Sequence, residues 1–187
     1  MPSDRPSPSR LRRAIRASWP WLLLAGAFAL WAFQGPSGET LQEGVPAPAL
    51  RVPWSLGGDL DLEAERGHVV VLAFWATWCP ACRQEGPVLS RVREQLEPRG
   101  DRVVGLSVDH GSVAAIGAAA RRLGMTYPIA VVDREVADRF NVELLPTVYV
   151  IDPRGRITAS FTGAVSEERL LAAVSAARGG GEQLSRR

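Results

Sequence analysis

The central strand and the first long helix of this chain are predicted from residues 69–82, VVVLAFWATWCPAC. The first half, residues 69–75, is an uninterrupted apolar run of strand length and predicts a buried strand. The two cysteines of the chain, Cys79 and Cys82, follow this strand with two residues between them. Pro80 suits the first position of a helix, so we expect Cys79 at the helix N-cap.

The N-terminus of a helix stabilises a thiolate, because its unpaired backbone N–H groups and the helix dipole favour negative charge. We therefore expect a lowered pKa and a nucleophilic thiolate at Cys79. Cys82 lies one turn further into the helix, as suits a shielded thiol that resolves a mixed disulfide. The spacing predicts a redox-active pair, Cys79 and Cys82, that exchanges electrons with other thiols and disulfides.

Three alternative roles exist for the cysteine pair. A zinc site would need two further ligands, and the two histidines, His68 and His110, do not stand at zinc-ligand spacing. A purely structural disulfide would close a loop too short to remove much entropy from the unfolded chain. A peroxidatic cysteine usually follows a proline and a threonine at fixed distances, whereas the residues ATW precede Cys79. The residues favour dithiol–disulfide exchange.

The N-terminal part of the chain combines a basic segment with an apolar one. Residues 1–33 hold five arginines and one acid, and residues 19–33, WPWLLLAGAFALWAF, carry no charge. A helix over 17–33 would rise about 26 Å, slightly less than the hydrocarbon thickness of a bilayer. Tryptophans near both ends, and arginines before it, predict a transmembrane anchor with residues 1–18 in the cytoplasm.

A cleaved signal peptide is the alternative, because Ala27-Phe28-Ala29 fits a small-x-small cleavage site. Both alternatives place the rest of the chain on the periplasmic or extracytoplasmic side of the cytoplasmic membrane. Residues 34–44 are rich in glycine and polar residues and predict a linker. The chain after residue 33 holds 17 arginines and 19 acids, so nothing there indicates nucleic-acid binding.

Residues 45–177 predict one domain in which strands and helices alternate. Besides the strand at 69–75, extended segments are expected at 57–62, 103–108, 127–132, 147–152 and 156–161. Helices are expected at 80–97, 112–123, 135–140 and 166–177. Residues 178–187 predict a disordered tail. This order favours an α/β fold with a mixed central β-sheet covered on both faces.

Four segments resemble the TlpA/ResA-type thioredoxin-like family of membrane-anchored thiol–disulfide oxidoreductases, which includes the CcmG/DsbE cytochrome c maturation proteins. They are the GxPAP-like opening at 44–48, FWATWCPAC with the following RQEGP at 74–87, LLPTVYVID at 144–152, and the turn at Gly155. The resemblance covers residues 44–177 and implies a thioredoxin-like fold with protein-disulfide reductase activity. We expect no cofactor and no bound metal.

Glu85 lies one helical turn beyond Cys82 and resembles the family's active-site glutamate. From the helix interior, its carboxylate would raise the thiol pKa by like-charge repulsion or accept the proton of Cys82 during resolution. A solvent-facing acid is the alternative, since Arg83 next to it is a surface residue type. Thioredoxin has a buried aspartate on the strand before the motif, where this chain has Ala73. We therefore expect Glu85 to be the only acid near the site.

The resemblance also implies a surface that binds substrate. Pro146 begins a strand where thioredoxin-like proteins carry a cis-proline beside the disulfide, and the Leu145 backbone there would bind an extended segment. A trans proline that starts an ordinary strand is the alternative. Trp78 and Pro80 are expected on the substrate-facing surface, whereas Trp75 is expected to pack beneath the motif.

The predicted reaction is the reduction of disulfides in exported client proteins. The resemblance implies apocytochrome c or copper-oxidase assembly proteins as clients, and a DsbD/CcdA-type membrane reductase as electron donor. Thr147 stands where CcmG-like proteins often carry a glutamate, which argues against a dedicated apocytochrome c reductant. A disulfide oxidase or isomerase is the alternative within the same chemistry. A copper-binding assembly factor is the alternative from another class, because thiolate pairs suit Cu(I).

Overall fold

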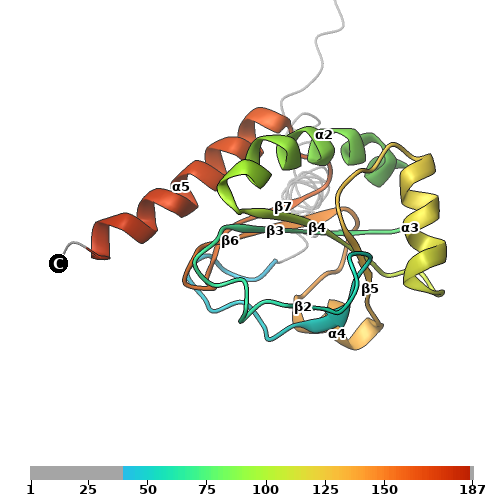
Figure 1. The fold of residues 1–187 in the computed structure, drawn as a ribbon, viewed down its shortest axis with the longest axis horizontal. Helices are drawn as coiled ribbons and strands as arrows, with labels where there is room; N and C mark the ends of the chain where they lie inside the picture. Colours follow the sequence, from blue (N-terminus) through green and yellow to red (C-terminus); the bar gives the residue numbers. More distant parts are fainter. Residues whose placement is uncertain (1–39, 186–187) are drawn as a thin grey trace, which may run out of the picture. The chain divides into compact units, whose positions relative to one another are not determined.

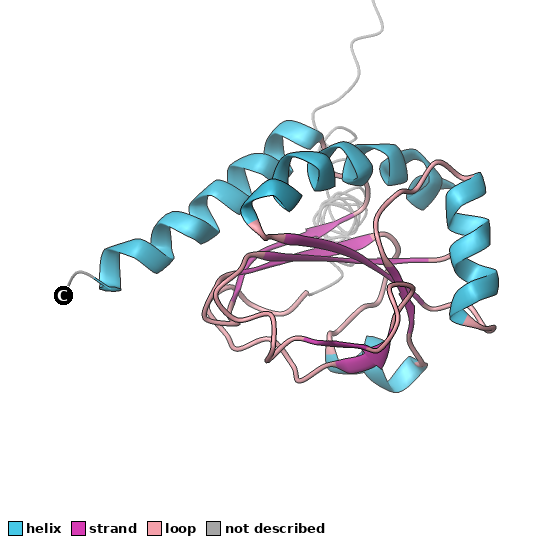
Figure 2. Cartoon of the chain, viewed as in Figure 1, coloured by secondary structure: helices cyan, strands magenta, loops and turns pink. Residues whose placement is uncertain are grey.

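The computed structural model of the protein describes residues 40–185 (Figure 1). The strands of the central sheet are β3 (Val70–Trp75), β4 (Arg102–Ser107), β5 (Ile129–Val131), β6 (Thr147–Ile151) and β7 (Ile157–Thr162). The helices are α2 (Pro80–Leu96), the short 3-10 helix η1 (Glu97–Arg99), α3 (Val113–Arg122), α4 (Arg134–Arg139) and α5 (Glu167–Ser185). A separate antiparallel hairpin is formed by β1 (Arg51–Pro53) and β2 (Asp59–Asp61). Figure 2 shows the helices packed around the strands.

The central sheet is mixed and has the strand order β5-β4-β3-β6-β7. Strand β3 pairs in parallel with β4 and antiparallel with β6. The last residue of β3, Trp75, is paired with Ser107 at the end of β4. Because β3 and β4 run in the same direction, the loops that follow them start at the same edge of the sheet. The loop that leads to Cys79 therefore begins beside the loop that follows β4.

Alternate residues of β3 belong to two cores, one on each face of the sheet. Val71, Ala73 and Trp75 pack with buried residues of α2, α3 and α5. Leu72 and Phe74 face the other side and pack with β2 and α4. Figure 1 shows α2 and α5 on one side of the sheet and α4 with β2 on the other. The predicted thioredoxin-like α/β fold, with a mixed sheet covered on both faces, is confirmed.

Helix α2 begins and ends close to the predicted bounds. Cys79 is its N-cap and Pro80 its first residue, as expected from the sequence. Gly100 ends η1, which follows α2 directly, with a φ of 80°. Only glycine takes this left-handed conformation without a steric cost, so the chain turns there toward β4.

The chain that precedes β1 lies along β7. A backbone hydrogen bond of 2.7 Å joins the Gly44 N–H to the carbonyl of Ile157. The hydroxyl groups of Thr40 and Ser160 form a second bond of 2.6 Å. Strand β7 is an edge strand, so its free backbone groups can bind this segment. The linker predicted at 34–44 is corrected at its end, because its last five residues belong to the folded domain.

The end of helix α5 is a second correction. The sequence predicted an end at Ala177 and a disordered tail at 178–187, but the helix continues to Ser185. Arg178, the first residue beyond the predicted end, forms an ion pair with the buried carboxylate of Asp101. The glycines that follow weaken a helix without stopping it.

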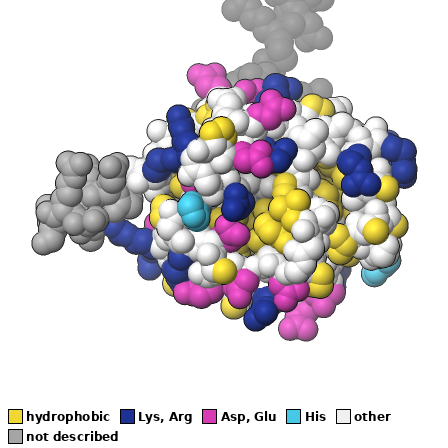
Figure 3. Space-filling view, in the orientation of Figure 1, with side chains coloured by type: hydrophobic (Ala, Val, Ile, Leu, Met, Phe, Trp, Pro, Cys, Tyr) yellow, Lys and Arg dark blue, Asp and Glu magenta, His cyan; other side chains and the backbone are white. Residues whose placement is uncertain are grey.

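Two predicted segments, the cytoplasmic residues 1–18 and the anchor at 19–33, lie outside the described residues. Between residues 40 and 185, no helix is long and apolar enough to cross a membrane. On the face of the domain shown in Figure 3, acidic and basic side chains are interspersed.

Candidate active site

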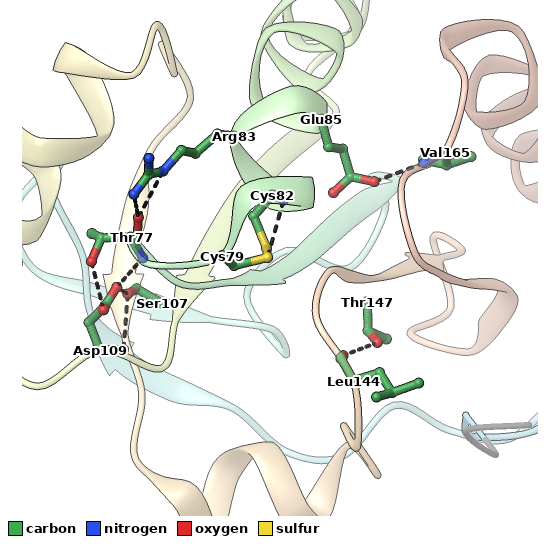
Figure 4. The surroundings of a disulfide bond; sticks show 10 residues. All are labelled: Thr77, Cys79, Cys82, Arg83, Glu85, Ser107, Asp109, Leu144, Thr147 and Val165. Carbon is green, nitrogen blue, oxygen red and sulfur yellow. Dashed lines mark hydrogen bonds between the residues drawn. A yellow bond between two sulfur atoms is a disulfide. The ribbon is translucent and has the colours of Figure 1, made fainter. Parts of the chain in front are cut away.

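The cysteine pair lies at the N-terminus of α2, at the edge of the sheet where β3 ends (Figure 4). Cys79 and Cys82 are joined in a disulfide. The Cys79 sulfur accepts a hydrogen bond from the Cys82 backbone N–H at 3.2 Å, so the sulfur itself caps the helix. In this position the helix N-terminus stabilises negative charge on Cys79 after the disulfide is reduced.

Both cysteines are nearly buried. Cys82 is 2% exposed, as expected for a shielded resolving thiol, and Cys79 is only 4% exposed. The burial of Cys79 was not predicted. Trp78 directly before it is 65% exposed, so the chain passes from the surface to the interior within one residue. A partner disulfide must therefore reach a nearly buried sulfur beside an exposed indole.

Glu85 lies in the interior, with an exposure of 2%. Its Oε1 accepts a hydrogen bond from the Val165 N–H at 3.0 Å, in the segment that leads to α5 (Figure 4). Burial raises the pKa of Glu85 to about 7, and the bond from Val165 opposes this effect. The solvent-facing alternative is excluded. A carboxyl that titrates near neutral pH is suited to accept or return a proton during thiol exchange.

Two buried aromatic residues lie beneath the motif. Trp75 packs in the core below the cysteines, as predicted. Burial, and to a smaller extent the charge of Glu85, raises the pKa of Tyr127. Sequence reasoning missed Tyr127, because a tyrosine at the start of a predicted strand gives no sign of such a neighbour.

The loop before β6 contains the predicted cis-proline. The peptide bond Leu145–Pro146 is cis, which confirms what the resemblance implied. Pro146 is buried and Leu145 is half-buried. The Thr147 hydroxyl donates to the carbonyl of Leu144 at 2.8 Å, which fixes the loop (Figure 4). The binding role of this loop stays a prediction.

Two of the segments that form this site carry an exposed apolar side chain. Among the described residues, the exposed large hydrophobic side chains are Leu56, Trp78 and Leu144. Trp78 precedes the nucleophile, and Leu144, which is 51% exposed, precedes the cis-proline loop segment. Such side chains beside a reactive group favour the binding of apolar segments. Sequence reasoning named Leu145 and missed Leu144.

Glu85 is not the only acid near the motif. The carboxylate of Asp109, which follows β4, accepts hydrogen bonds from Thr77, just before the cysteines. The expectation of a single acid was wrong. It was based on β3, the strand before the motif, whereas Asp109 follows the neighbouring strand β4. The pairing of Trp75 with Ser107 brings the loop after β4 to the motif. A carboxylate directly after a neighbouring parallel strand was the available signal.

A thioredoxin-like sheet that presents a Cys-X-X-Cys disulfide at a helix N-terminus is the arrangement of a thiol–disulfide oxidoreductase. The model of the AhpC/TSA family matches residues 44–160, which is more than half of the chain. The chain belongs to this family.

Similar proteins narrow the class further. The thiol-disulfide oxidoreductase ResA of Bacillus subtilis is 29% identical over 133 residues, which cover 71% of this chain and 74% of that protein. The protein of the same name from Geobacillus kaustophilus is 32% identical over 114 residues, which cover 60% of this chain and 64% of that protein.

Two solved structures have the same fold. One, from Chlorobium tepidum, is described as a thiol:disulfide interchange protein DsbE; its TM-score is 0.66 at 26% identity, over 74% of this chain and 99% of that one. The other is a DsbF homologue from Corynebacterium diphtheriae, with a TM-score of 0.65 at 26% identity, over 76% of this chain and 96% of that one. The protein is a thiol–disulfide oxidoreductase of the ResA/DsbE type.

Proposed function

We propose that the protein reduces disulfides in exported client proteins through Cys79 and Cys82. The observation that carries this direction is the burial of the Glu85 carboxyl one helical turn beyond Cys82. A buried carboxylate at this place repels a thiolate and raises the pKa of the thiols. Thiols whose thiolate form is less stabilised give up electrons more readily, which is the property of a reductant.

The reaction has two exchange steps. The Cys79 thiolate attacks a client disulfide, forms a mixed disulfide and releases one client thiolate. Cys82 then loses its proton to the Glu85 carboxylate and attacks the Cys79 sulfur, which re-forms the Cys79–Cys82 disulfide and releases the second client thiolate. The client gains two electrons and takes up two protons. The enzyme is left oxidised and needs two electrons from a further reductant.

The surface beside the disulfide fits an extended apolar client segment. Trp78 and Leu144 supply exposed apolar contacts, and the bend at Leu145 and Pro146, with its cis peptide bond, supplies backbone groups. In line with the family resemblance, the clients are apocytochrome c or copper-oxidase assembly proteins. The electron donor is a DsbD/CcdA-type membrane reductase.

The proposed location is the outer side of the cytoplasmic membrane, with residues 19–33 as a single-pass anchor. The arginine-rich segment before this apolar stretch supports the orientation. Digestion of the domain by protease added to intact spheroplasts tests the location, and protection of the domain would contradict it.

Insulin serves as a disulfide-containing probe of the proposed activity. We expect the reduced full-length protein to cleave insulin disulfides and to become oxidised at Cys79 and Cys82. Cys82→Ser should instead accumulate a covalent mixed disulfide between Cys79 and insulin, visible on a non-reducing gel, because the resolving thiol is absent. Cys79→Ser should form no such adduct. Turnover of insulin by Cys79→Ser, or an adduct through Cys82 alone, would contradict the assigned roles.

A further inference from the structure

We propose that Asp109 is a positioning residue that holds the loop before Cys79 in place for thiol–disulfide exchange. Its Oδ2 accepts hydrogen bonds from the Thr77 N–H and from the Ser107 hydroxyl, both at 2.8 Å. Its Oδ1 accepts a third bond, from the Thr77 hydroxyl, at 2.9 Å. One carboxylate thus joins the end of β4 to the loop that follows β3 (Figure 4).

Arg83 also binds Thr77, at its carbonyl group. Its Nε and Nη2 both donate to the carbonyl of Thr77, at 3.1 Å and 2.8 Å. Arg83 lies in the first turn of α2, so this contact joins the loop to the helix that Cys79 caps. The N–H, hydroxyl and carbonyl groups of Thr77 are therefore all bonded. We call Asp109, Thr77 and Arg83 the Thr77 clamp.

The Thr77 clamp acts on Cys79 through the short turn between them. The Cys79 N–H donates to the carbonyl of Ala76 at 3.2 Å, so the turn closes around Thr77. The Cys79 sulfur must stay aligned with the Cys82 N–H if the helix N-terminus is to stabilise its thiolate. Loosening the turn weakens this alignment. None of the clamp contacts involves a sulfur atom.

Charge and positioning predict opposite effects for the loss of Asp109. The charged side chains that Figure 4 draws near the motif are Asp109, Arg83 and Glu85. A carboxylate near Cys79 disfavours the thiolate by repulsion, so removing only the charge favours the thiolate. Removing the clamp disfavours the thiolate, because the hydrogen bond at the helix N-cap is weakened.

Asparagine at position 109 separates the two effects. Its oxygen can accept both bonds that Oδ2 accepts, and its NH2 group can donate to the Thr77 hydroxyl. Asp109→Asn therefore removes the charge and keeps the clamp, whereas Asp109→Ala removes both. Thr77→Val removes one clamp bond and keeps the charge. The matched control is Asp133→Ala, which removes the N-cap of α4, away from the disulfide.

The measurement is the rate at which iodoacetamide alkylates Cys79 in the reduced full-length protein, followed against pH by mass spectrometry. Thermal unfolding shows which variants are folded. We expect the pH midpoint of Asp109→Ala to lie about one unit above that of Asp109→Asn, the size expected when one hydrogen bond to a charged acceptor is weakened. At a pH below both midpoints, alkylation of Asp109→Ala should be roughly threefold slower than that of Asp109→Asn. A higher pKa lowers the fraction of Cys79 that is thiolate, and the higher nucleophilicity of that thiolate partly offsets this loss.

The other variants complete the test. Thr77→Val should raise the midpoint above that of the wild type, and Asp133→Ala should match the wild type. Equal midpoints for Asp109→Asn and Asp109→Ala would mean that the carboxylate acts by charge alone, which would overturn the proposal. If Asp109→Ala does not fold, an unchanged midpoint for Thr77→Val overturns it instead.

Discussion

Burial raises the pKa of Glu85 from 4.5 to about 7, so this carboxyl holds its proton more tightly in the folded protein than in the unfolded chain. Between these two values the folded state binds more protons, and stability therefore falls as the pH rises. The contribution of Glu85 to the free energy of unfolding is complete below the pKa that it has in the unfolded chain. It is lost as the pH rises through the pKa that it has in the folded protein. A shift of this size corresponds to about 3 kcal/mol.

We expect Glu85→Gln to remove this pH dependence, because glutamine does not titrate and still offers an oxygen to the Val165 N–H. Relative to the wild type, the free energy of unfolding of Glu85→Gln should increase by about 3 kcal/mol between about pH 4.5 and about pH 7.5. Urea unfolding of both proteins at a series of pH values measures this difference in the free energy of unfolding. Glu94→Gln, an exposed acid on the same helix, is the control and should keep the wild-type dependence. The same dependence in Glu85→Gln would contradict the burial of this carboxyl.

The reactive residues could be predicted from the sequence because the signals are local. Cys79, Pro80, Cys82 and Glu85 stand within seven positions, and helix geometry relates them directly. Asp109 could not be found in this way, because it is 32 residues from Thr77 and reaches it only through the parallel pairing of β3 with β4. The cis bond before Pro146 came from the family resemblance and from no local rule.

At the scale of elements, the helices and strands of the domain follow the sequence patterns closely. Helix α2 has a proline at its start and a glycine after η1, and both signals are local. The two boundary errors depend on tertiary contacts. Thr40 and Gly44 join the domain because β7 has a free edge, and α5 passes Ala177 where Arg178 meets the buried Asp101. Neither contact can be predicted from the local sequence.

Close packing between β4 and β5 makes Gly105 sensitive to substitution. A Cβ there would lie 2.8 Å from the side chains of Ile129 and Tyr127 and 2.9 Å from the indole nitrogen of Trp75. We expect Gly105→Ala to lower the free energy of unfolding by about 1–3 kcal/mol, because the added methyl overpacks the core. Urea unfolding at constant pH measures this loss.

The matched glycine for this comparison is Gly179 in α5, where a Cβ would meet nothing within 4 Å. Gly179→Ala should raise the free energy of unfolding by up to about 1 kcal/mol, since alanine favours a helix over glycine. A neutral result at Gly105 would contradict the packing around β4. A loss of stability at Gly179 would contradict the continuation of α5 beyond Ala177.

At the scale of the whole molecule, the fold places each part of the site at one edge of the sheet. The cysteines follow strand β3, Asp109 follows β4, and the cis-proline lies in the loop before β6. The alternation of strands and helices, followed by two strands with only a turn between them, was sufficient to predict this mixed sheet, since parallel neighbours need a crossover and antiparallel ones do not. The strand order, which decides which loops meet, is not encoded in any single segment.

The central claim is that Cys79 and Cys82 form a reducing dithiol whose potential is set in part by Glu85. The most direct measurement equilibrates the full-length protein with thiol redox buffers under nitrogen and follows tryptophan fluorescence together with thiol trapping. We predict a reversible two-electron transition at or below about −200 mV, and a less negative potential for Glu85→Gln at a pH above 7, where the wild-type carboxyl is ionised. Glu94→Gln should leave the potential unchanged. A potential near about −120 mV would identify an oxidant or isomerase instead, and the absence of any reversible transition would contradict the account entirely.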